Sequence, residues 1–156
     1  RLKSLISKKI SISSNDINLY VLGEHGNSQF VYYNNANIAM SSIKNYLTKE
    51  EKDEFSSITK KMGGMIVSSK GYTSHGVSCC LLELTKVILN DEKKIYPVSN
   101  YQSDHDLYFS MPAVIWKEGI IKQIPVKLNE EEEKQLVMVT KVLRQAVDEV
   151  LPPELY

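Results

Sequence analysis

The sequence has few of the residues that mark disulfide-rich, metal-binding or membrane proteins. Its 156 residues include only two cysteines, Cys79 and Cys80. Because they are adjacent, they can build neither a disulfide framework nor a metal-ligand spacing, and we expect buried thiols. No apolar run approaches the roughly 20 residues of a membrane span, and the first residues lack the layout of a signal peptide. The sequence therefore predicts a soluble, cytoplasmic protein that binds no metal.

An excess of charge of one sign is also missing. The 19 basic residues balance 19 acidic ones, so no overall field attracts nucleic acid or an anionic membrane. No repeat, low-complexity tract or change of composition divides the chain, and we predict one domain over residues 1–156. The sequence begins at Arg1 inside a helical pattern, which we interpret as the interior of a longer polypeptide.

Apolar spacing predicts four helices. The first covers residues 2–9. The second begins at Thr48, whose spacing to Glu51 is that of a capping box, and ends near Ser69. The third follows the segment KGYTS (residues 70–74), and Val77 lies in its first turn. The fourth begins at Asn129, carries acidic residues at 130–133 near the positive end of its dipole, and ends before Pro152 and Pro153.

Strand-like segments are expected between these helices. A buried strand over residues 17–22 precedes the polar loop GEHGNS (residues 23–28), and a second strand resumes at Gln29. Three further strands, predicted over residues 95–101, 107–116 and 120–126, suggest an antiparallel meander. The predicted fold class is α+β, with long helices packed on antiparallel strands.

The loop histidine, His25, is the strongest candidate for chemistry, since an imidazole after a buried strand can be reached by a small substrate and titrates near neutral pH. A lone histidine is nevertheless more often an ordinary surface residue. His105, between Asp104 and Asp106, looks like a metal cluster, but side chains so close on one turn rarely converge on an ion. We interpret that turn, and the acidic run 130–133, as solvated.

The string LGEHGNSQF (residues 22–30) resembles the active-site signature of L-lactate and L-2-hydroxyisocaproate dehydrogenases. Three more features follow the order of that family: Arg1, 24 positions before His25; the KGYTS segment; and IYPVSNY at residues 95–101. The resemblance covers nearly all of this chain but only the C-terminal half of a family member. It implies that a Rossmann half, which binds NAD, is missing here, and no G-x-G-x-x-G occurs in the sequence.

The resemblance also implies residue roles. His25 would protonate the carbonyl oxygen of a 2-oxo acid and act as the base in the reverse reaction. Arg1 would bind the substrate carboxylate through two parallel N–H donors, unless it is merely a solvated residue. Thr73 would line the substrate pocket, although by itself it is a plausible N-cap. Val77 would face the nicotinamide ring or the pocket wall, with an ordinary core valine almost as plausible.

Two partners of the family mechanism are not found: the aspartate that orients the histidine and an arginine on a mobile loop. We therefore expect this chain alone to be inactive. Asn27 and His75 depart from the usual lactate dehydrogenase pattern and leave the substrate side chain open. The resemblance implies a homodimer or homotetramer. Two alternatives stay open, a malate dehydrogenase and a non-catalytic assembly domain that retains the fold.

Overall fold

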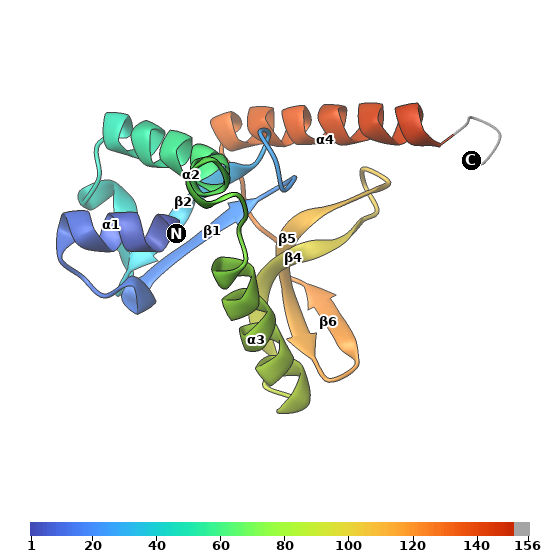
Figure 1. Ribbon diagram of the computed structural model, residues 1–156, viewed down its shortest axis with the longest axis horizontal. Coiled ribbons are helices and arrows are strands. Elements are labelled where there is room, and N and C mark those ends of the chain that lie inside the picture. Colours follow the sequence, from blue (N-terminus) through green and yellow to red (C-terminus); the bar gives the residue numbers. More distant parts are fainter. Residues whose placement is uncertain (152–156) are drawn as a thin grey trace.

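A computed structural model describes residues 1–151 (Figure 1). Pro152 and Pro153, expected to end the last helix, lie outside the described residues. The helices are α1 (Leu2–Ile10), α2 (Lys49–Lys70), α3 (His75–Leu89) and α4 (Glu130–Val150). The strands are β1 (Ile17–Leu22), β2 (Phe30–Ile38), β3 (Ser41–Ser42), β4 (Lys94–Gln102), β5 (Leu107–Trp116) and β6 (Gly119–Gln123). These elements confirm the α+β class.

The strands form two antiparallel sheets, β1–β2–β3 and β4–β5–β6. The second sheet is the expected meander. The first is longer than predicted, because β2, expected over residues 29–33, continues to Ile38 and β3 adds a short third strand. The two sheets meet at one isolated bridge, where Gly23 pairs with Ser110 of β5. The end of β1 is thereby joined to the second sheet.

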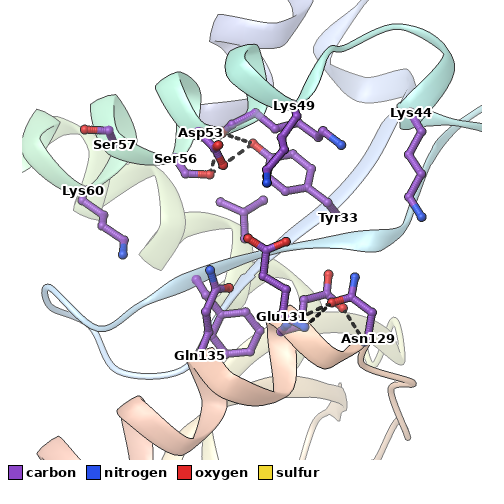
Figure 2. Close-up of a pocket in the computed structure, with 14 residues that line it drawn as sticks. Tyr33, Lys44, Lys49, Asp53, Ser56, Ser57, Lys60, Asn129, Glu131 and Gln135 are labelled. Carbon is purple, nitrogen blue, oxygen red and sulfur yellow. Dashed lines mark hydrogen bonds between the residues drawn. The ribbon is translucent and has the colours of Figure 1, made fainter.

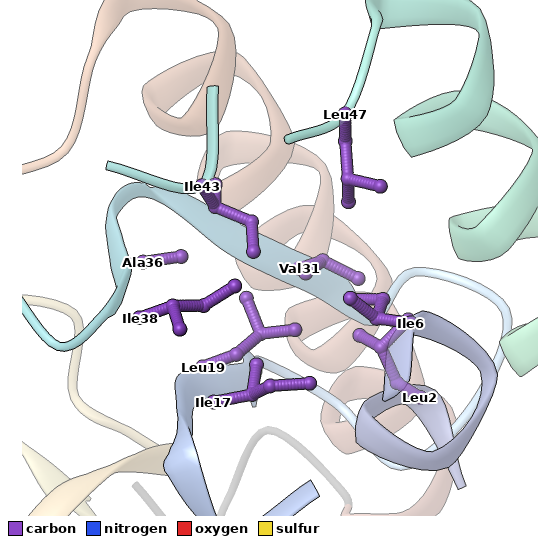
Figure 3. Packing of buried hydrophobic residues seen from close by; sticks show 9 residues of the cluster. All are labelled: Leu2, Ile6, Ile17, Leu19, Val31, Ala36, Ile38, Ile43 and Leu47. Carbon is purple, nitrogen blue, oxygen red and sulfur yellow. The ribbon is translucent and has the colours of Figure 1, made fainter. Parts of the chain in front are cut away.

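The first sheet separates two hydrophobic cores because side chains alternate across a strand. On one face α1 covers β1 and β2 with Leu2 and Ile6, which share one side of the helix (Figure 3). We call this cluster the first core. Its members are Leu2, Ile6, Ile17, Leu19, Val31, Ala36, Ile38, Ile43 and Leu47.

The opposite face carries the second core, which α4 covers. Its buried members are Leu22, Phe30, Tyr32, Leu107, Phe109 and Val139. The sequence predicts an apolar stripe on α4 formed by Leu136, Val139, Leu143, Ala146 and Val150. Val139 is fully buried, and Leu136 and Leu143 pack in the second core as predicted. Ala146 and Val150 of that stripe are exposed, and Val147, which was not predicted to belong to it, packs against the core instead.

Capping boxes begin both long helices. Thr48 and Glu51 exchange bonds at the start of α2 as the sequence predicts, and Asn129 and Glu132 do so at the start of α4. One expectation is wrong here. Glu132 is not on a solvated face but buried, because its carboxylate also accepts the backbone N–H of Asn34 at 2.8 Å. This bond ties α4 to β2.

Helix α3 forms where expected, but only Val87 on it is buried. The sequence predicts an apolar stripe on this helix formed by Val77, Leu81, Leu84, Val87 and Ile88. Most of this stripe is uncovered, with Val77 61% and Leu81 65% exposed and Ile88 also exposed. Cys79 and Cys80 are exposed, so the expectation of buried thiols is wrong for this chain. An amphipathic pattern shows that a face suits burial, but the partner that buries it need not be in the same segment. Within residues 1–151, no helix is both long and apolar enough to span a membrane.

Candidate active site

The loop that holds His25 is fixed at its base by backbone hydrogen bonds. Gly23 N–H donates to the Ser110 carbonyl at 2.9 Å, and Ser110 N–H donates back to the Gly23 carbonyl at 2.8 Å. Gly23 has φ +92°, and a Cβ there would lie 2.7 Å from Cγ2 of Val139. Only glycine meets both demands, the positive φ and the close approach of α4.

The rest of the loop folds around Glu24. Its carboxylate accepts the backbone N–H of Ser28 at 3.3 Å and also the Ser28 hydroxyl. His25 lies between these two residues in the sequence; its side chain is exposed and has no hydrogen-bond partner among residues 1–151. The structure thus confirms a polar loop with an accessible imidazole.

Arg1 lies at the start of α1, where its carbonyl accepts the N–H of Leu5 at 3.1 Å. Its guanidinium reaches between two other helices. A Cβ added at Gly76 of α3 would be 3.3 Å from Nη2, and one added at Gly63 of α2 would be 3.8 Å from Nη1. No carboxylate or other acceptor in the described chain binds this guanidinium, so its donors are free for a ligand.

The start of α3 differs from the starts of α2 and α4. It has neither a side-chain cap nor an acidic residue in its first turn, so its N–H groups and dipole stay open to an anion. Thr73 is half-buried just before this turn, and Val77 within it is 61% exposed. Val77 is therefore not a core valine of this chain. Close by, Lys70 Nζ lies 3.2 Å from Nδ1 of His75.

The structure therefore brings two of the predicted substrate residues to one place, since Arg1 and Thr73 both lie at the N-terminal end of α3. No hydrogen bond or ion pair joins His25 to either of them in the described chain. Sequence reasoning missed Gly63 and Gly76, which flank Arg1. The signal was available, because a glycine inside a helical pattern weakens the helix and calls for a packing reason.

A groove elsewhere in the molecule has none of the predicted site residues in its wall (Figure 2). Its volume is about 560 Å³, and it lies between the first half of α2, strand β2 and the start of α4. Four lysines line it, Lys44, Lys49, Lys52 and Lys60, and none is within 4.0 Å of a carboxylate in residues 1–151. Asp53 and Glu131 share its wall.

The floor of this groove is a hydroxyl network. Tyr33 donates to the carbonyl of Lys52 at 3.1 Å, and the Ser56 hydroxyl donates to the same carbonyl at 2.8 Å. Burial, opposed by the Ser56 hydroxyl and assisted by Asp53, raises the pKa of Tyr33 above its usual range. The tyrosine is thus a neutral donor. In the part of the chain that the structure describes, no three His, Cys, Asp or Glu side chains are grouped to hold a metal ion.

Known proteins resemble this chain in sequence and in fold. It is 28% identical to an L-lactate dehydrogenase of Streptococcus equinus over 99% of the chain, and 33% identical to L-lactate dehydrogenase 2 of Lactobacillus johnsonii over 95%. It spans 50% of the length of each. These relatives are oxidoreductases, and the chain matches about half of each.

Solved structures of lactate and malate dehydrogenases resemble the fold of this chain. A lactate dehydrogenase from a Medee basin deep-sea metagenome library matches with a TM-score of 0.90 and 31% identity, over 94% of this chain and 50% of that one. The malate dehydrogenase of Aeropyrum pernix matches with a TM-score of 0.89 and 32% identity, over 99% and 51%. The family model for the lactate/malate dehydrogenase, alpha/beta C-terminal domain matches residues 1–152. The chain belongs to this family of lactate/malate dehydrogenase C-terminal domains.

Proposed function

We propose that the chain is the substrate-binding and catalytic half of an NAD-dependent L-2-hydroxy-acid dehydrogenase of the L-lactate type, which interconverts a 2-oxo acid and an L-2-hydroxy acid. The observation that carries the proposal is the unpaired guanidinium of Arg1 beside the uncapped start of α3. A planar guanidinium and a positive helix end are both suited to a carboxylate. Thr73 adds a hydroxyl at the same end.

In this proposal Arg1 binds the substrate carboxylate in a bidentate manner and so fixes which face of the molecule is presented. His25 then donates a proton to the carbonyl oxygen at C2, and in the opposite direction removes it from the hydroxyl. The accessible, unpartnered imidazole supports this role. The base of the loop, held by Gly23 and Ser110, limits where the imidazole can go.

When bound, the cofactor would supply hydride to C2 of the 2-oxo acid as NADH, or take it up from C2 of the 2-hydroxy acid as NAD⁺. The chain fits this cofactor only in part. Its sequence has no glycine-rich pyrophosphate turn, whereas exposed Val77 in the first turn of α3 offers an apolar contact for a nicotinamide ring. We therefore propose that a Rossmann half of the same polypeptide holds most of the cofactor and packs against the exposed apolar side of α3. The complete protein would be a cytoplasmic homodimer or homotetramer.

Malate dehydrogenase is a second candidate, favoured by the 32% identity and the TM-score of 0.89 to the Aeropyrum pernix enzyme. The two differ in the substrate that the site must accept. A malate dehydrogenase reduces oxaloacetate, whose second carboxylate needs a further cationic partner. Rates of NADH oxidation with pyruvate, 2-oxoisocaproate and oxaloacetate separate the two candidates in the full-length protein.

The deciding experiment substitutes His25→Asn in the full-length protein, with His105→Asn as its matched control. Loss of a general acid typically lowers kcat by about 10²–10⁴-fold, and we expect that loss for His25→Asn with NADH binding unchanged. His105, whose ring packs near Phe109 in the turn between β4 and β5, should be dispensable. Equal kcat values for the two variants would contradict the assigned role of His25. Turnover by residues 1–151 alone would contradict the need for a second half.

A further inference from the structure

Two glycines in different helices lie on either side of the Arg1 guanidinium. Gly63 is inside α2, and Gly76 is in the first turn of α3. An added Cβ would be 3.8 Å from Nη1 at the first position, and 3.3 Å from Nη2 and 4.0 Å from Nε at the second. The guanidinium therefore lies in a slot whose two sides are bare backbone.

The neighbouring glycine provides an internal comparison. Gly64 follows Gly63 in the same helix, yet a Cβ added there would meet nothing within 4 Å. Gly63 and Gly64 are both unfavourable in a helix relative to alanine, so the cost to helix formation is similar for both. Of the two, only Gly63 has the Arg1 guanidinium beside it, at a distance that leaves room for a methyl group but not for a larger side chain.

We propose that Gly63 and Gly76 are positioning residues, which leave room for the Arg1 guanidinium between α2 and α3 and so set the plane in which it meets the substrate carboxylate. The inference rests on the proposed function, in which Arg1 binds that carboxylate. Bidentate pairing depends on the orientation of the guanidinium plane, so a shift of a few tenths of an ångström at Nη2 changes both hydrogen bonds.

The spacing at the two positions predicts graded effects. A methyl group at Gly76 makes a contact tighter than is ordinarily tolerated, whereas one at Gly63 makes an ordinary van der Waals contact. Among the glycine-to-alanine variants, only Gly76→Ala should therefore displace the Arg1 guanidinium. A larger side chain is needed at the α2 side, so Gly63→Leu should disturb Arg1 where Gly63→Ala does not.

The test uses the full-length protein and steady-state kinetics with the 2-oxo acid that it reduces best. Gly76→Ala and Gly63→Leu should raise KM roughly tenfold while kcat changes by less than about threefold, since substrate binding and not proton transfer is affected. The matched controls Gly64→Ala and Gly64→Leu should leave KM unchanged. Because alanine is the better helix former, Gly76→Ala should not lower the unfolding midpoint, which excludes misfolding as the cause of a raised KM.

A second measurement does not depend on turnover. The Nε–H signal of Arg1 in an NMR spectrum can be assigned by its absence from an Arg1→Lys variant. Its chemical shift should change in Gly76→Ala and not in Gly64→Ala. If the NADH assay finds no reduction of any 2-oxo acid but the Nε–H shift changes only in Gly76→Ala, the positioning of Arg1 by the glycines is supported and the proposed function is contradicted. If the Gly76 and Gly64 variants change KM or the Nε–H signal equally, the proposal that Gly63 and Gly76 position the Arg1 guanidinium is wrong.

Discussion

Helices α1 and α3 both carry an apolar stripe, yet the chain covers one and leaves the other open. Leu2 and Ile6 of α1 are buried against β1 and β2. On α3, Val87 alone is buried, and Val77 and Leu81 are mostly exposed. An apolar stripe therefore identifies only a surface that is suited to burial. Which element covers that surface is a separate question, which the spacing of residues in the helix does not answer.

The largest expected effect tests this comparison directly with one truncation in each helix. Ile6 is fully buried, and Ile6→Ala should lower the free energy of unfolding by about 2–5 kcal/mol, through lost burial and a cavity. Leu81→Ala removes a side chain that is 65% exposed and should change the stability of this chain little. Urea unfolding of both variants measures the difference. If Leu81→Ala costs as much as Ile6→Ala, α3 is covered in this chain and the comparison is wrong.

A second pair of substitutions compares two glycines with positive φ, Gly23 after β1 and Gly71 just before α3. Gly23 has φ +92° with Val139 against it, whereas Gly71, before α3, has φ +83° and open space around it. Alanine at Gly71 should cost about 1–2 kcal/mol for the left-handed backbone alone. Alanine at Gly23 adds overpacking against α4 and should cost about 2–5 kcal/mol in total. Thermal unfolding distinguishes them, and equal costs would mean that α4 gives way easily.

The smallest expected effect concerns charge. Lys9 of α1 pairs with Glu51 of α2 at 2.7 Å, whereas Glu83 of α3 has no ion pair in the described chain. The hydrogen bond from Lys9, with that from the Thr48 backbone, lowers the pKa of Glu51. A carboxyl whose pKa is lower in the folded state stabilises the fold above its unfolded pKa, and this contribution is lost as pH falls through the folded pKa.

Glu51→Gln should therefore lower the unfolding midpoint slightly near neutral pH, and the difference from the wild type should vanish in acid below the folded-state pKa of Glu51. Glu83→Gln is the matched control, and because Glu83 forms no ion pair within 4.0 Å in the described chain, its unfolding midpoint should stay close to that of the wild type. Unfolding midpoints measured from neutral to acidic pH check both variants. A pH-independent deficit in Glu51→Gln would show that the charge of Glu51 does not contribute to stability and would contradict the role given to its ion pair with Lys9.

Much of the fold follows from local patterns in the sequence. Apolar spacing and the capping box at Thr48 predict the helices to within a few residues, and the apolar run in residues 17–22 predicts β1. The burial of Glu132 was not predictable in this way, since it depends on Asn34 nearly a hundred residues away. The exposure of Cys79 and Cys80 was missed for the related reason that their helix lacks a partner here.

The candidate site was predictable mainly through resemblance. The polar loop with His25 and the helix after KGYTS form as expected, while the roles of His25, Arg1, Thr73 and Val77 stay proposals. Nothing in the spacing of the residues indicated that Arg1 would reach between two helices, because that contact joins three segments far apart in sequence. The glycines inside apolar helical patterns are the feature of the sequence that points to such a contact, because a glycine there weakens the helix and calls for a packing reason.

The close contact between Val139 and Gly23 makes the position of the His25 loop depend on helix α4. Helix α4 contributes no residue to the proposed chemistry, yet Val139 closes the space above Gly23 and so holds the foot of the His25 loop. Removing residues from the carboxyl end back past Val139 would remove this contact and leave the base of the His25 loop at Gly23 less constrained. A boundary chosen for transplanting the loop into another scaffold must therefore include α4 together with β1, β2 and β5.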